Sequence, residues 1–487
     1  MSRNAVTFRF RGAEVSLKRF LPRTTLLDWL REEAGAKGTK EGCGEGDCGA
    51  CTVVLSRLKD GRPTYEAVNA CILLLGQVDG AEVLTVEDLG DGGALHPVQQ
   101  AMVDEHGSQC GFCTPGIVMS LFALYHERTP ATHEAICDQL AGNLCRCTGY
   151  RPIVDAALST CLGAPNDKFE RAIAARVAAI SALDDGADMF VGDDDAFFAA
   201  PSSEASLSAL YLRHPDAVLV GGATDVGLWV TKQLKDPKKI IWLGRVAGLE
   251  RMEETAEALT IYAMTKLEDT RPSLKALHED IDEIMRRFGS AQVRLSGTVG
   301  GNVANGSPIG DTPPVFIALD ATLELRKGDV SRRLPIEKFF VGYGKQDRRP
   351  SEYVRSITVP KLKANQQFRA LKVSKRFDED ISAVMSAFRL TLDQRRIVEA
   401  RLAYGGMAAT PKRAAEAEAA LVGASLDDRA SWERALSAIA ADFTPLTDMR
   451  ATAAYRARVA SNLLLKALIE IAGHDAPTRI GALLAAE

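Results

Sequence analysis

The sequence predicts an α+β protein built from several domains, on three observations. The chain has 487 residues, which exceeds the size of one ordinary domain. Strand-like and helix-like patterns alternate in blocks along it. All ten cysteines lie between Cys43 and Cys161, so one part of the chain has a chemistry that the rest lacks. We therefore expect five segments, which are residues 1–90, 91–163, 164–200, 201–365 and 366–487.

The first segment, residues 1–90, has the signals of a β-grasp fold. Residues 6–17 alternate apolar and polar side chains on both sides of an Arg-Gly turn, which predicts a hairpin. A short helix follows, with Thr25 as its N-cap and Gly35 at its C-terminus. A loop rich in glycine and cysteine then leads into a strand at 51–56. This order of strand pair, helix, loop and further strands is typical of a small β-grasp domain.

The next two segments differ in regularity. Residues 91–163 show helical spacing in four stretches without strand signals between them, which predicts a four-helix domain. Residues 164–200 are acidic and have no settled period, so we expect an exposed connecting segment without chemistry.

Strands and helices alternate again after residue 200. Residues 217–230 read as a strand that contains a Gly-Gly turn, and residues 281–289 as a helix that ends at Gly289. We expect an α+β domain over residues 201–365. Two long strands and a closing helix at 451–472 predict another α+β domain over residues 366–487.

The first group of cysteines has the spacing of a plant-type [2Fe–2S] site, C-x4-C-x2-C followed by a distant fourth cysteine. The glycines between the thiols allow backbone N–H groups to wrap closely around a cluster. Zinc is the alternative, but structural zinc is usually bound by two short cysteine or histidine pairs. The spacing therefore favours a [2Fe–2S] cluster. Its predicted ligands are Cys43, Cys48, Cys51 and Cys71.

The second group leaves both metals open on spacing alone, because two cysteine pairs also suit zinc. Thr114 is a candidate helix N-cap with Pro115 at the first helical position, and Thr148 is a second candidate N-cap. Two helix N-termini beside the thiols would favour an anionic cluster. The predicted ligands are the pairs Cys110-x2-Cys113 and Cys145-x-Cys147.

Composition excludes several other classes of protein. The net charge is −5 without a basic stripe, so nucleic acid is not an expected partner. The sequence has no run of 18 apolar residues, so no membrane-spanning helix is predicted. The N-terminus lacks the apolar core of a signal peptide. We expect a cytoplasmic protein, in which disulfides rarely persist. The two remaining cysteines, Cys137 and Cys161, are predicted to be buried free thiols on helices.

The sequence resembles the xanthine dehydrogenase/molybdenum hydroxylase family. The motifs that carry the resemblance include "KEGCGEGDCGACTV", "HPVQQAM", "GSQCGFCTPG", "AGNLCRCTGYRPI", "GTVGGNVANGSPIGD" and "FTPLTDMRATAAYR". They extend over nearly the whole chain and match the small, iron–sulfur and flavin subunit of bacterial members. The resemblance implies that the second cysteine group also holds a [2Fe–2S] cluster.

Two glycine-rich turns characterise the middle of the chain, "LVGGATDVG" and "GTVGGNVANGSPIGD". Neither is the G-x-G-x-x-G fingerprint, so a Rossmann dinucleotide site is not supported. They could be ordinary tight turns, or they could cradle a pyrophosphate with backbone N–H groups.

The family resemblance implies that these turns bind FAD. The matching residues are Val218, Leu219, Val220, Gly221, Gly222, Ala223, Thr224, Asp225, Thr298, Val299, Gly300, Gly301 and Asn302. The resemblance also places Phe288 near the flavin, assigns the ribose to Asp311 and puts Lys372 close to the cofactor. Asp225 stands where animal members usually carry glutamate, so its role is less defined than that of the turn.

The same resemblance implies a function in electron transfer. Electrons would pass from a molybdenum centre through the second cluster, the first cluster and FAD to NAD+, during oxidation of hypoxanthine and xanthine to urate. The chain would have no catalytic residues for the purine and would be active only with a large molybdopterin-containing subunit, in a heterotetramer of two small and two large chains. Gln109 and Cys147 match family positions near the pterin. The alternatives are another molybdenum hydroxylase, oxidising aldehydes or CO, or a zinc-stapled scaffold protein without a redox role.

Overall fold

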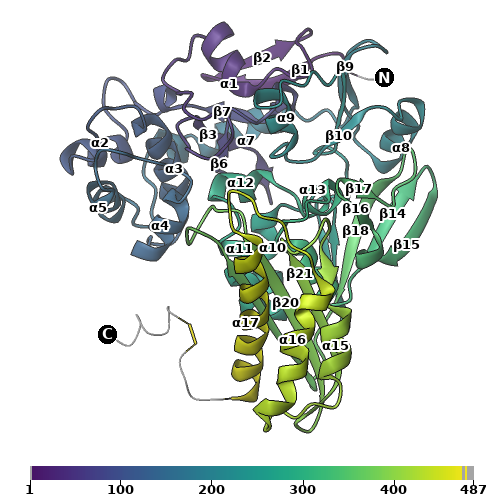
Figure 1. Cartoon of the computed structure of the whole chain (residues 1–487). Coiled ribbons are helices and arrows are strands. Elements are labelled where there is room, and N and C mark those ends of the chain that lie inside the picture. The colour runs from purple at the N-terminus through teal and green to yellow at the C-terminus, as the bar shows by residue number, and fades with distance from the viewer. Residues whose placement is uncertain (1–2, 474–477, 480–487) are drawn as a thin grey trace.

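The N-terminal domain is a mixed five-stranded sheet in the order β2-β1-β7-β3-β6, in a computed structural model that describes residues 3–473 and 478–479 (Figure 1). β1 pairs antiparallel with β2 and parallel with β7, which confirms the predicted hairpin and the β-grasp fold. The predicted short helix begins at its N-cap Thr25 and continues as a π-helical turn, Trp29–Glu33. The elements are β1 Val6–Phe10, β2 Ala13–Leu17, α1 Leu26–Asp28, β3 Thr52–Ser56, β4 Leu58–Lys59, β5 Arg62–Pro63, β6 Glu66–Asn69 and β7 Glu82–Leu84.

The second domain is the predicted four-helix unit and packs beside the first (Figure 1). Its central helix is α3, in which every residue from Gly116 to Tyr125 is buried. The other helices surround it and cover its apolar side chains. The helices are α2 Pro97–Asp104, α3 Thr114–Tyr125, α4 His133–Leu140 and α5 Arg151–Thr160.

The expectation of an exposed connecting segment over residues 164–200 is only partly correct, because many of its residues are exposed but the segment has regular structure. This segment forms α6 Lys168–Arg171, α7 Ile173–Ser181, β8 Met189–Gly192 and β9 Phe197–Ala200. All four residues of β9 are buried, because other elements cover both faces of this strand. A strand buried on both faces shows no alternation of apolar and polar residues, and here an acidic turn precedes a very short apolar run.

The middle of the chain contains two larger sheets and a two-stranded one, β16-β17. The first has the order β10-β11-β9-β8, and the second has the order β12-β13-β18-β14-β15. The strand expected over residues 217–230 stops at Val220, because Ala223 adopts a left-handed conformation and α9 begins at Val226. The helix expected to end at Gly289 ends at Arg286. The strands are β10 Val218–Val220, β11 Lys239–Trp242, β12 Met252–Glu254, β13 Ala258–Tyr262, β14 Thr322–Lys327, β15 Val330–Pro335, β16 Phe340–Gly342, β17 Lys345–Gln346 and β18 Tyr353–Pro360.

Short helices connect these two sheets and bring their loops together. The most important for the site are α9, which follows the first glycine-rich turn, α12, which precedes the second, and α13, which the second turn itself forms. The helices are α8 Glu204–Arg213, α9 Val226–Thr231, α10 Leu267–Leu277, α11 Glu279–Arg286, α12 Ala291–Ser296, α13 Val299–Asn305 and α14 Thr312–Ala318.

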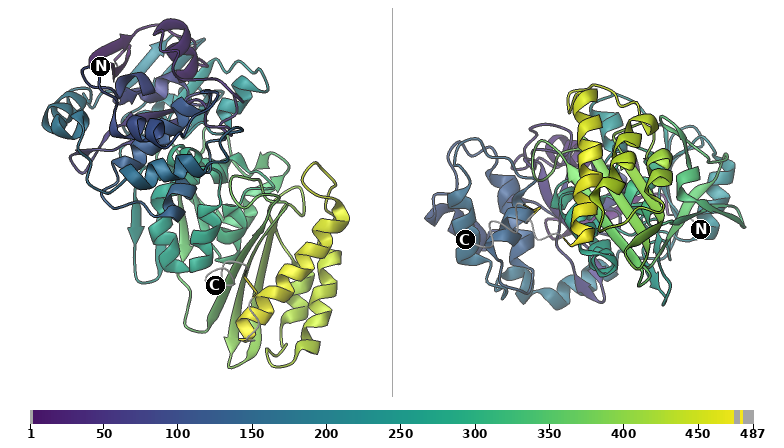
Figure 2. Two further views of the ribbon diagram at one scale, coloured as in Figure 1. Left: turned by 90° about the vertical axis from the view of Figure 1, so that its left-hand side faces the viewer. Right: turned by 60° about the horizontal axis from the view of Figure 1, so that its bottom comes forward.

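The C-terminal domain is an antiparallel sheet, β19-β20-β21-β22, with three helices on one face (Figure 2). Its core lies between this sheet and the helices, around Phe388, Tyr404 and Trp432. The elements are β19 Gln366–Val373, β20 Val384–Asp393, β21 Arg396–Gly405, β22 Lys412–Arg413, α15 Ala415–Leu421, α16 Glu433–Asp442 and α17 Ala453–Ala472. The last of these confirms the predicted closing helix.

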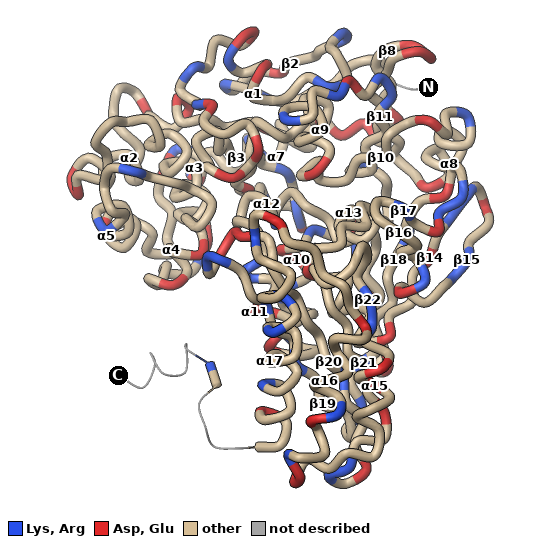
Figure 3. Tube along the Cα trace, in the orientation of Figure 1, with Lys and Arg blue, Asp and Glu red and all other residues tan. Residues whose placement is uncertain are grey.

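Charged residues of both signs are interspersed over all of these domains (Figure 3). Among residues 3–473 and 478–479, no helix combines the length and the apolar character that crossing a membrane requires.

Candidate cluster sites and flavin cavity

The first cysteine group converges in the loop that precedes β3. The Cys43 thiol lies close to those of Cys48 and Cys71, and Cys71 contacts Cys51 in turn. The backbone N–H groups of Glu45 and Cys48 each approach Cys43 Sγ at 3.4 Å. The four predicted ligands therefore face one point, surrounded by backbone donors.

The electrostatics of this first group suit a metal cluster. Contacts with the Cys43 and Cys51 thiols, together with burial, raise the pKa of Cys71, while hydrogen bonds from Cys48 and Cys71 lower the pKa of Cys43. Four adjacent thiols cannot all ionise without a compensating cation. Iron supplies that charge when a cluster is bound, so the residues present fit a [2Fe–2S] cluster.

A glycine is required beside these thiols. At Gly42, an added Cβ would lie 2.7 Å from Cys48 Sγ. The chain can therefore pass close to the thiols only without a side chain at this position.

The second cysteine group lies at helix ends on the surface. Cys113 contacts Cys145, and Cys110 contacts Cys147, so the two predicted pairs meet. Burial, with a smaller contribution from Cys145, raises the pKa of Cys113 to about 12. Cys110 and Cys147 are exposed. This second site is therefore open to solvent on one side.

Both predicted N-caps in this region need correction. Cys113 is the N-cap of α3, so Thr114 is the first helical residue and Pro115 the second. α5 has Tyr150 as its N-cap in a left-handed conformation, because the chain turns at Gly149 and Tyr150 before the helix begins. Thr148 instead places its hydroxyl 3.2 Å from Cys145 Sγ and accepts a hydrogen bond from the Tyr150 N–H.

Only one of the two remaining cysteines is buried. Cys161 is 2% exposed, and burial raises its pKa to about 12. Cys137 is exposed on α4, which corrects the expectation that it is buried. The buried face of this helix is formed by Ile136 and Leu140.

The two glycine-rich turns lie side by side and line a cavity of about 700 Å³. An added Cβ would lie 1.8 Å from Ser296 O at Gly222 and 2.8 Å from Thr298 Oγ1 at Gly221, so the two turns approach each other closely. The Thr298 hydroxyl accepts a hydrogen bond from the Gly301 N–H. The predicted residues that line the cavity are Val218, Leu219, Gly221, Gly222, Ala223, Thr224, Asp225, Phe288, Thr298, Gly300, Gly301 and Asn302.

The other predicted flavin residues lie behind the cavity wall. Val220 and Val299 are buried in the core. Lys372 Nζ lies 2.7 Å from Asp311 Oδ2 and donates to the carbonyl of Arg287 at 3.1 Å, next to Phe288. The other oxygen of Asp311 accepts a hydrogen bond from Ser382 at 2.5 Å. Since both Asp311 oxygens are engaged, its assignment to the ribose stays a prediction.

Several cavity residues were not predicted from the sequence. Tyr211, Trp229, Arg348 and Val354 line the cavity and come from four separate elements or loops. None of them belongs to a motif, so only the fold brings them together. Among the predicted residues, burial raises the pKa of Asp225.

A second cavity, of about 480 Å³, lies on the other side of the glycine-rich turns. Gly221, Gly222, Met264 and Thr298 line both cavities and form the wall between them. The N-terminal domain contributes Arg57 and Glu66 to the second cavity.

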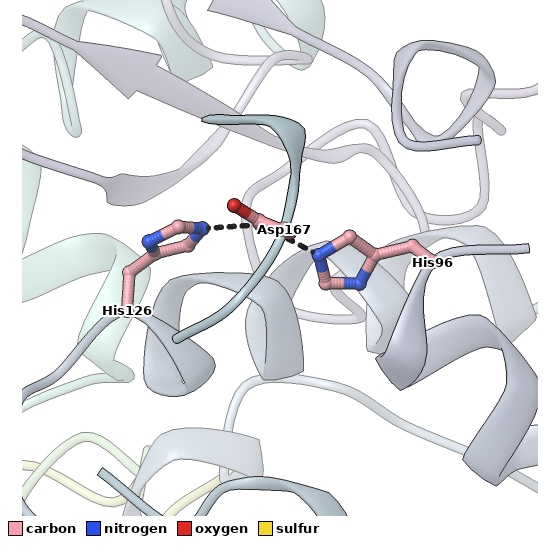
Figure 4. A group of neighbouring side chains, drawn as sticks. All are labelled: His96, His126 and Asp167. Atoms are coloured by element: carbon pink, nitrogen blue, oxygen red, sulfur yellow. Dashed lines mark hydrogen bonds and ion pairs between the residues drawn. The ribbon is translucent and has the colours of Figure 1, made fainter. Parts of the chain in front are cut away.

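A buried cluster of two histidines and one aspartate was also missed (Figure 4). His96 Nε2 and His126 Nε2 lie 2.8 and 2.9 Å from the same Asp167 oxygen. His96 Nδ1 accepts a hydrogen bond from the Val98 N–H, so the neutral ring carries its proton on Nε2 and has no lone pair there for a metal. We interpret the cluster as a hydrogen-bonded clamp that fixes α6 to the helical domain.

Four family models match successive parts of the chain. They are "2Fe-2S iron-sulfur cluster binding domain" at residues 11–75, "[2Fe-2S] binding domain" at 85–158, "FAD binding domain in molybdopterin dehydrogenase" at 194–362 and "CO dehydrogenase flavoprotein C-terminal domain" at 369–471. The chain belongs to the molybdenum hydroxylase family and contains the iron–sulfur and flavin domains of that family. The two predicted [2Fe–2S] domains and the FAD-binding domain are thereby confirmed, and iron–sulfur chemistry replaces the zinc alternative.

Curated relatives of this molybdenum hydroxylase portion are xanthine dehydrogenases. The chain is 32% identical to "Xanthine dehydrogenase" of Emericella nidulans over 90% of its own length and 36% of the relative's. It is 33% identical to "Xanthine dehydrogenase/oxidase" of Rattus norvegicus over 84% of its own length and 34% of the relative's. The chain thus spans about a third of the curated relatives that it matches.

Solved structures extend the molybdenum hydroxylase likeness. A Cu,Mo-CO dehydrogenase is 27% identical with a TM-score of 0.52, covering 55% of this chain and 94% of that one. Carbon monoxide dehydrogenase from Hydrogenophaga pseudoflava is 27% identical with a TM-score of 0.53, covering 56% and 95%. Quinoline 2-oxidoreductase from Pseudomonas putida 86, at 21% identity with a TM-score of 0.52, shows the shared fold alone over 56% of this chain and 95% of that one.

Proposed function

We propose that this chain is the electron-transfer component of a xanthine dehydrogenase. In this proposal electrons from a molybdenum centre on a partner chain enter at the Cys110–Cys147 site. They pass the Cys43–Cys71 site and the flavin cavity and leave on NAD+, while hypoxanthine and xanthine are oxidised to urate. One-electron clusters beside a flavin are a cofactor set that converts single electrons into the hydride that a nicotinamide takes.

The observation that carries this proposal is the spatial order of the three sites. The Leu144 N–H, next to Cys145, donates to the Cys48 carbonyl at 3.0 Å. The second cysteine loop, here called the outer loop, therefore touches the first, which is called the inner loop. Beside the first cysteine site, α9 lies directly against Ile72, the residue next to Cys71. An added Cβ at Gly227 of α9 would lie 2.4 Å from the Ile72 carbonyl oxygen. α9 follows the glycine-rich turn that lines the cavity.

The residues of the chain have separate tasks in this order. The N–H groups of Glu45 and Cys48 stabilise negative charge on Cys43 Sγ. Lys232 donates to the Cys43 carbonyl, and Arg376 lies 3.6 Å from Asp47, so the flavin and C-terminal domains hold the first loop against them. The glycine-rich turns would hold the FAD pyrophosphate through their backbone N–H groups.

The partner in this proposal is a molybdopterin-containing large chain, in a heterotetramer of two small and two large chains. Apolar side chains are exposed around the outer cysteine site, with Phe112 at 48%, Leu144 at 39% and Tyr150 at 36%. An apolar surface beside exposed ligands suits a docking face. Gln109, next to Cys110, belongs to the same surface.

The test is activity of the purified complex with NAD+ on xanthine, on aldehydes and on CO. We expect NAD+ reduction with xanthine and hypoxanthine. Activity confined to CO would instead support the second candidate, a CO-oxidising molybdenum hydroxylase, which the 27% identity to CO dehydrogenase structures favours. Activity confined to aldehydes would likewise contradict the assignment to purines.

A further inference from the structure

A buried hydrogen-bond network joins the two cysteine loops to the flavin domain. Thr52 follows the first cysteine loop, Ser120 lies on α3, Asn143 precedes the second cysteine pair, and Gln292 lies on α12. Their exposed fractions are 1%, 0%, 2% and 0%. Three domains therefore meet at one buried polar junction, located between the two cluster sites.

The main chains of the two cysteine loops touch at this junction because glycines line it. Gly49 lies between Cys48 and Cys51 with a φ of +67°, and an added Cβ there would lie 2.0 Å from Gly142 O. An added Cβ at Gly116 would lie 2.1 Å from Gly49 O. The 3.0 Å hydrogen bond from Leu144 N–H to Cys48 O directly links a residue next to Cys145 to the first loop.

Gln292 is the hub of this network and comes from the flavin domain. Its Nε2 donates to Asn143 Oδ1 at 2.8 Å and to Ser120 Oγ at 3.1 Å, and it approaches Thr52 Oγ1 at 3.4 Å. Asn143 Nδ2 in turn lies 3.2 Å from both Gly49 O and Thr52 Oγ1. Gln292, together with the Ser120 hydroxyl, which donates to Asn143 Oδ1 at 2.6 Å, thus orients the amide that holds the Gly49 carbonyl.

The buried amide of Gln292 is energetically unfavourable if the side chain serves only for packing. Its Oε1 is buried and, among the described residues, has no hydrogen-bond partner. A buried unsatisfied acceptor lowers the stability of the fold, and an apolar side chain of similar shape would avoid that loss. The donors of this side chain therefore have a task that offsets the cost.

We propose that Gln292 is a positioning residue for electron transfer between the two clusters. By holding Asn143 against Gly49, it fixes the Cys48–Leu144 hydrogen bond and the separation of the two cysteine sites. The step is the passage of one electron from the Cys110–Cys147 site to the Cys43–Cys71 site, with no bond made or broken. This inference rests on the proposed electron-transfer function, but not on the identity of the oxidised substrate.

The test compares Gln292→Met, which keeps the volume and removes the donors, with Gln99→Met. Gln99 is a matched control because its Nε2 donates at 3.1 Å to Val86 O and so also joins the first two domains, away from the junction. The purified chain with its clusters and flavin is partly reduced with dithionite. Rapid-freeze EPR then follows how electrons distribute between the two clusters, and the magnetic interaction of the fully reduced clusters is recorded.

We expect Gln292→Met to slow the exchange between the clusters about tenfold, the lower end of the loss when an outer-shell partner of a metal site is removed. The magnetic interaction should change, while iron and flavin contents and the Gln99→Met protein stay unaltered. Because Gln292 acts through Asn143, the effect should not add to that of Asn143→Leu. Gln292→Asn, which keeps the amide but shortens its reach, should be intermediate and serves if the Met variant loses its clusters.

An unchanged exchange rate and magnetic interaction in a fully loaded Gln292→Met or Gln292→Asn protein would overturn the proposal. An equal effect of Gln99→Met would also overturn it, since the loss would then reflect general loosening of the domains. These readouts are independent of xanthine turnover, so failure of the substrate assignment is distinguishable from failure of the role proposed for Gln292.

Discussion

Each of the two cysteine sites has four thiols, but the chain surrounds the thiols differently in the two sites. In the first site a glycine-rich loop wraps around the thiols, and Cys51 and Cys71 are 2% and 3% exposed. In the second site the thiols lie beside the starts of α3 and α5, and Cys110 and Cys147 are exposed. A loop can enclose a cluster on several sides, whereas the helix ends leave one side open. The inner site is therefore the more shielded one, with two thiols buried and Cys43 and Cys48 half-buried, and the outer site is where a redox partner can approach.

The largest expected effect follows from removing one ligand at each site. Cys71→Ala and Cys147→Ala should each lose two irons and two sulfides per chain, the content of one [2Fe–2S] cluster. Only Cys71→Ala should also lower the melting temperature, because Cys71 belongs to the core of the N-terminal domain whereas Cys147 does not. Iron and sulfide analysis, EPR and thermal unfolding check this. Loss of both EPR signals in Cys147→Ala would show that the sites are not independent.

A substitution at the contact between the sites should affect both. Gly49→Ala places a Cβ 2.0 Å from Gly142 O at a φ of +67°. We expect a loss of about 1–3 kcal/mol in the free energy of unfolding, from backbone strain, and a shift in both EPR signals. Gly342→Ala is the matched control, because its Cβ would meet only Lys345 Cβ at 3.9 Å. Equal unfolding curves for the two variants would mean that the loops are not in contact.

The histidine–aspartate clamp should make the helical domain sensitive to pH. Burial alone would raise the pKa of Asp167, but hydrogen bonds from His126 and His96 outweigh it and hold this pKa well below its usual range. Burial lowers the pKa of His126 despite the opposing effect of Asp167, and His96 and Arg176 lower it further. The unfolded state therefore binds more protons than the folded one below about pH 6.5, so the free energy of unfolding falls as the pH falls through this range.

Two variants isolate this contribution. His126→Phe keeps a ring against Tyr65, which stacks on His126 at 3.8 Å, and should flatten the pH dependence between about pH 7.5 and 5.5. Asp167→Asn should cost about 1–2 kcal/mol at neutral pH, because a neutral amide accepts hydrogen bonds more weakly than a carboxylate. Chemical denaturation at several pH values measures both. A His126→Phe protein with the pH profile of the unchanged chain would contradict the clamp.

The smallest effect is expected at Cys137. Since this thiol is exposed and its hydrogen-bond contact is with His133 Nδ1 at 3.7 Å, Cys137→Ser should leave iron content and stability unchanged within about 0.5 kcal/mol. In the iron-depleted chain, Cys137 should react with an alkylating reagent well before Cys161, which is buried. Mass spectrometry of the alkylated peptides resolves the order. Faster labelling of Cys161 would contradict the burial that separates the two thiols.

The sequence was most informative where a local pattern decides the structure. Cysteine spacing brought the ligands of both sites to notice, and apolar periodicity predicted the first hairpin and the four helices. It failed where the pattern is silent. The buried β9 has no alternation, and no local pattern predicts the left-handed conformation of Tyr150, after Gly149, that delays the start of α5. Gln292 could not be singled out, because a glutamine on a short helix is ordinary until the fold places it between two cysteine loops.

The sequence and the fold together point to two unlike [2Fe–2S] clusters in line with one flavin in this chain. Iron, sulfide and flavin analysis combined with EPR of the dithionite-reduced chain tests it most directly. We expect about four irons, about four sulfides and one flavin per chain, with two distinct EPR signals, because each cluster binds two irons and the two sites differ in burial. Zinc in place of iron, a single EPR signal or a chain without flavin would contradict it.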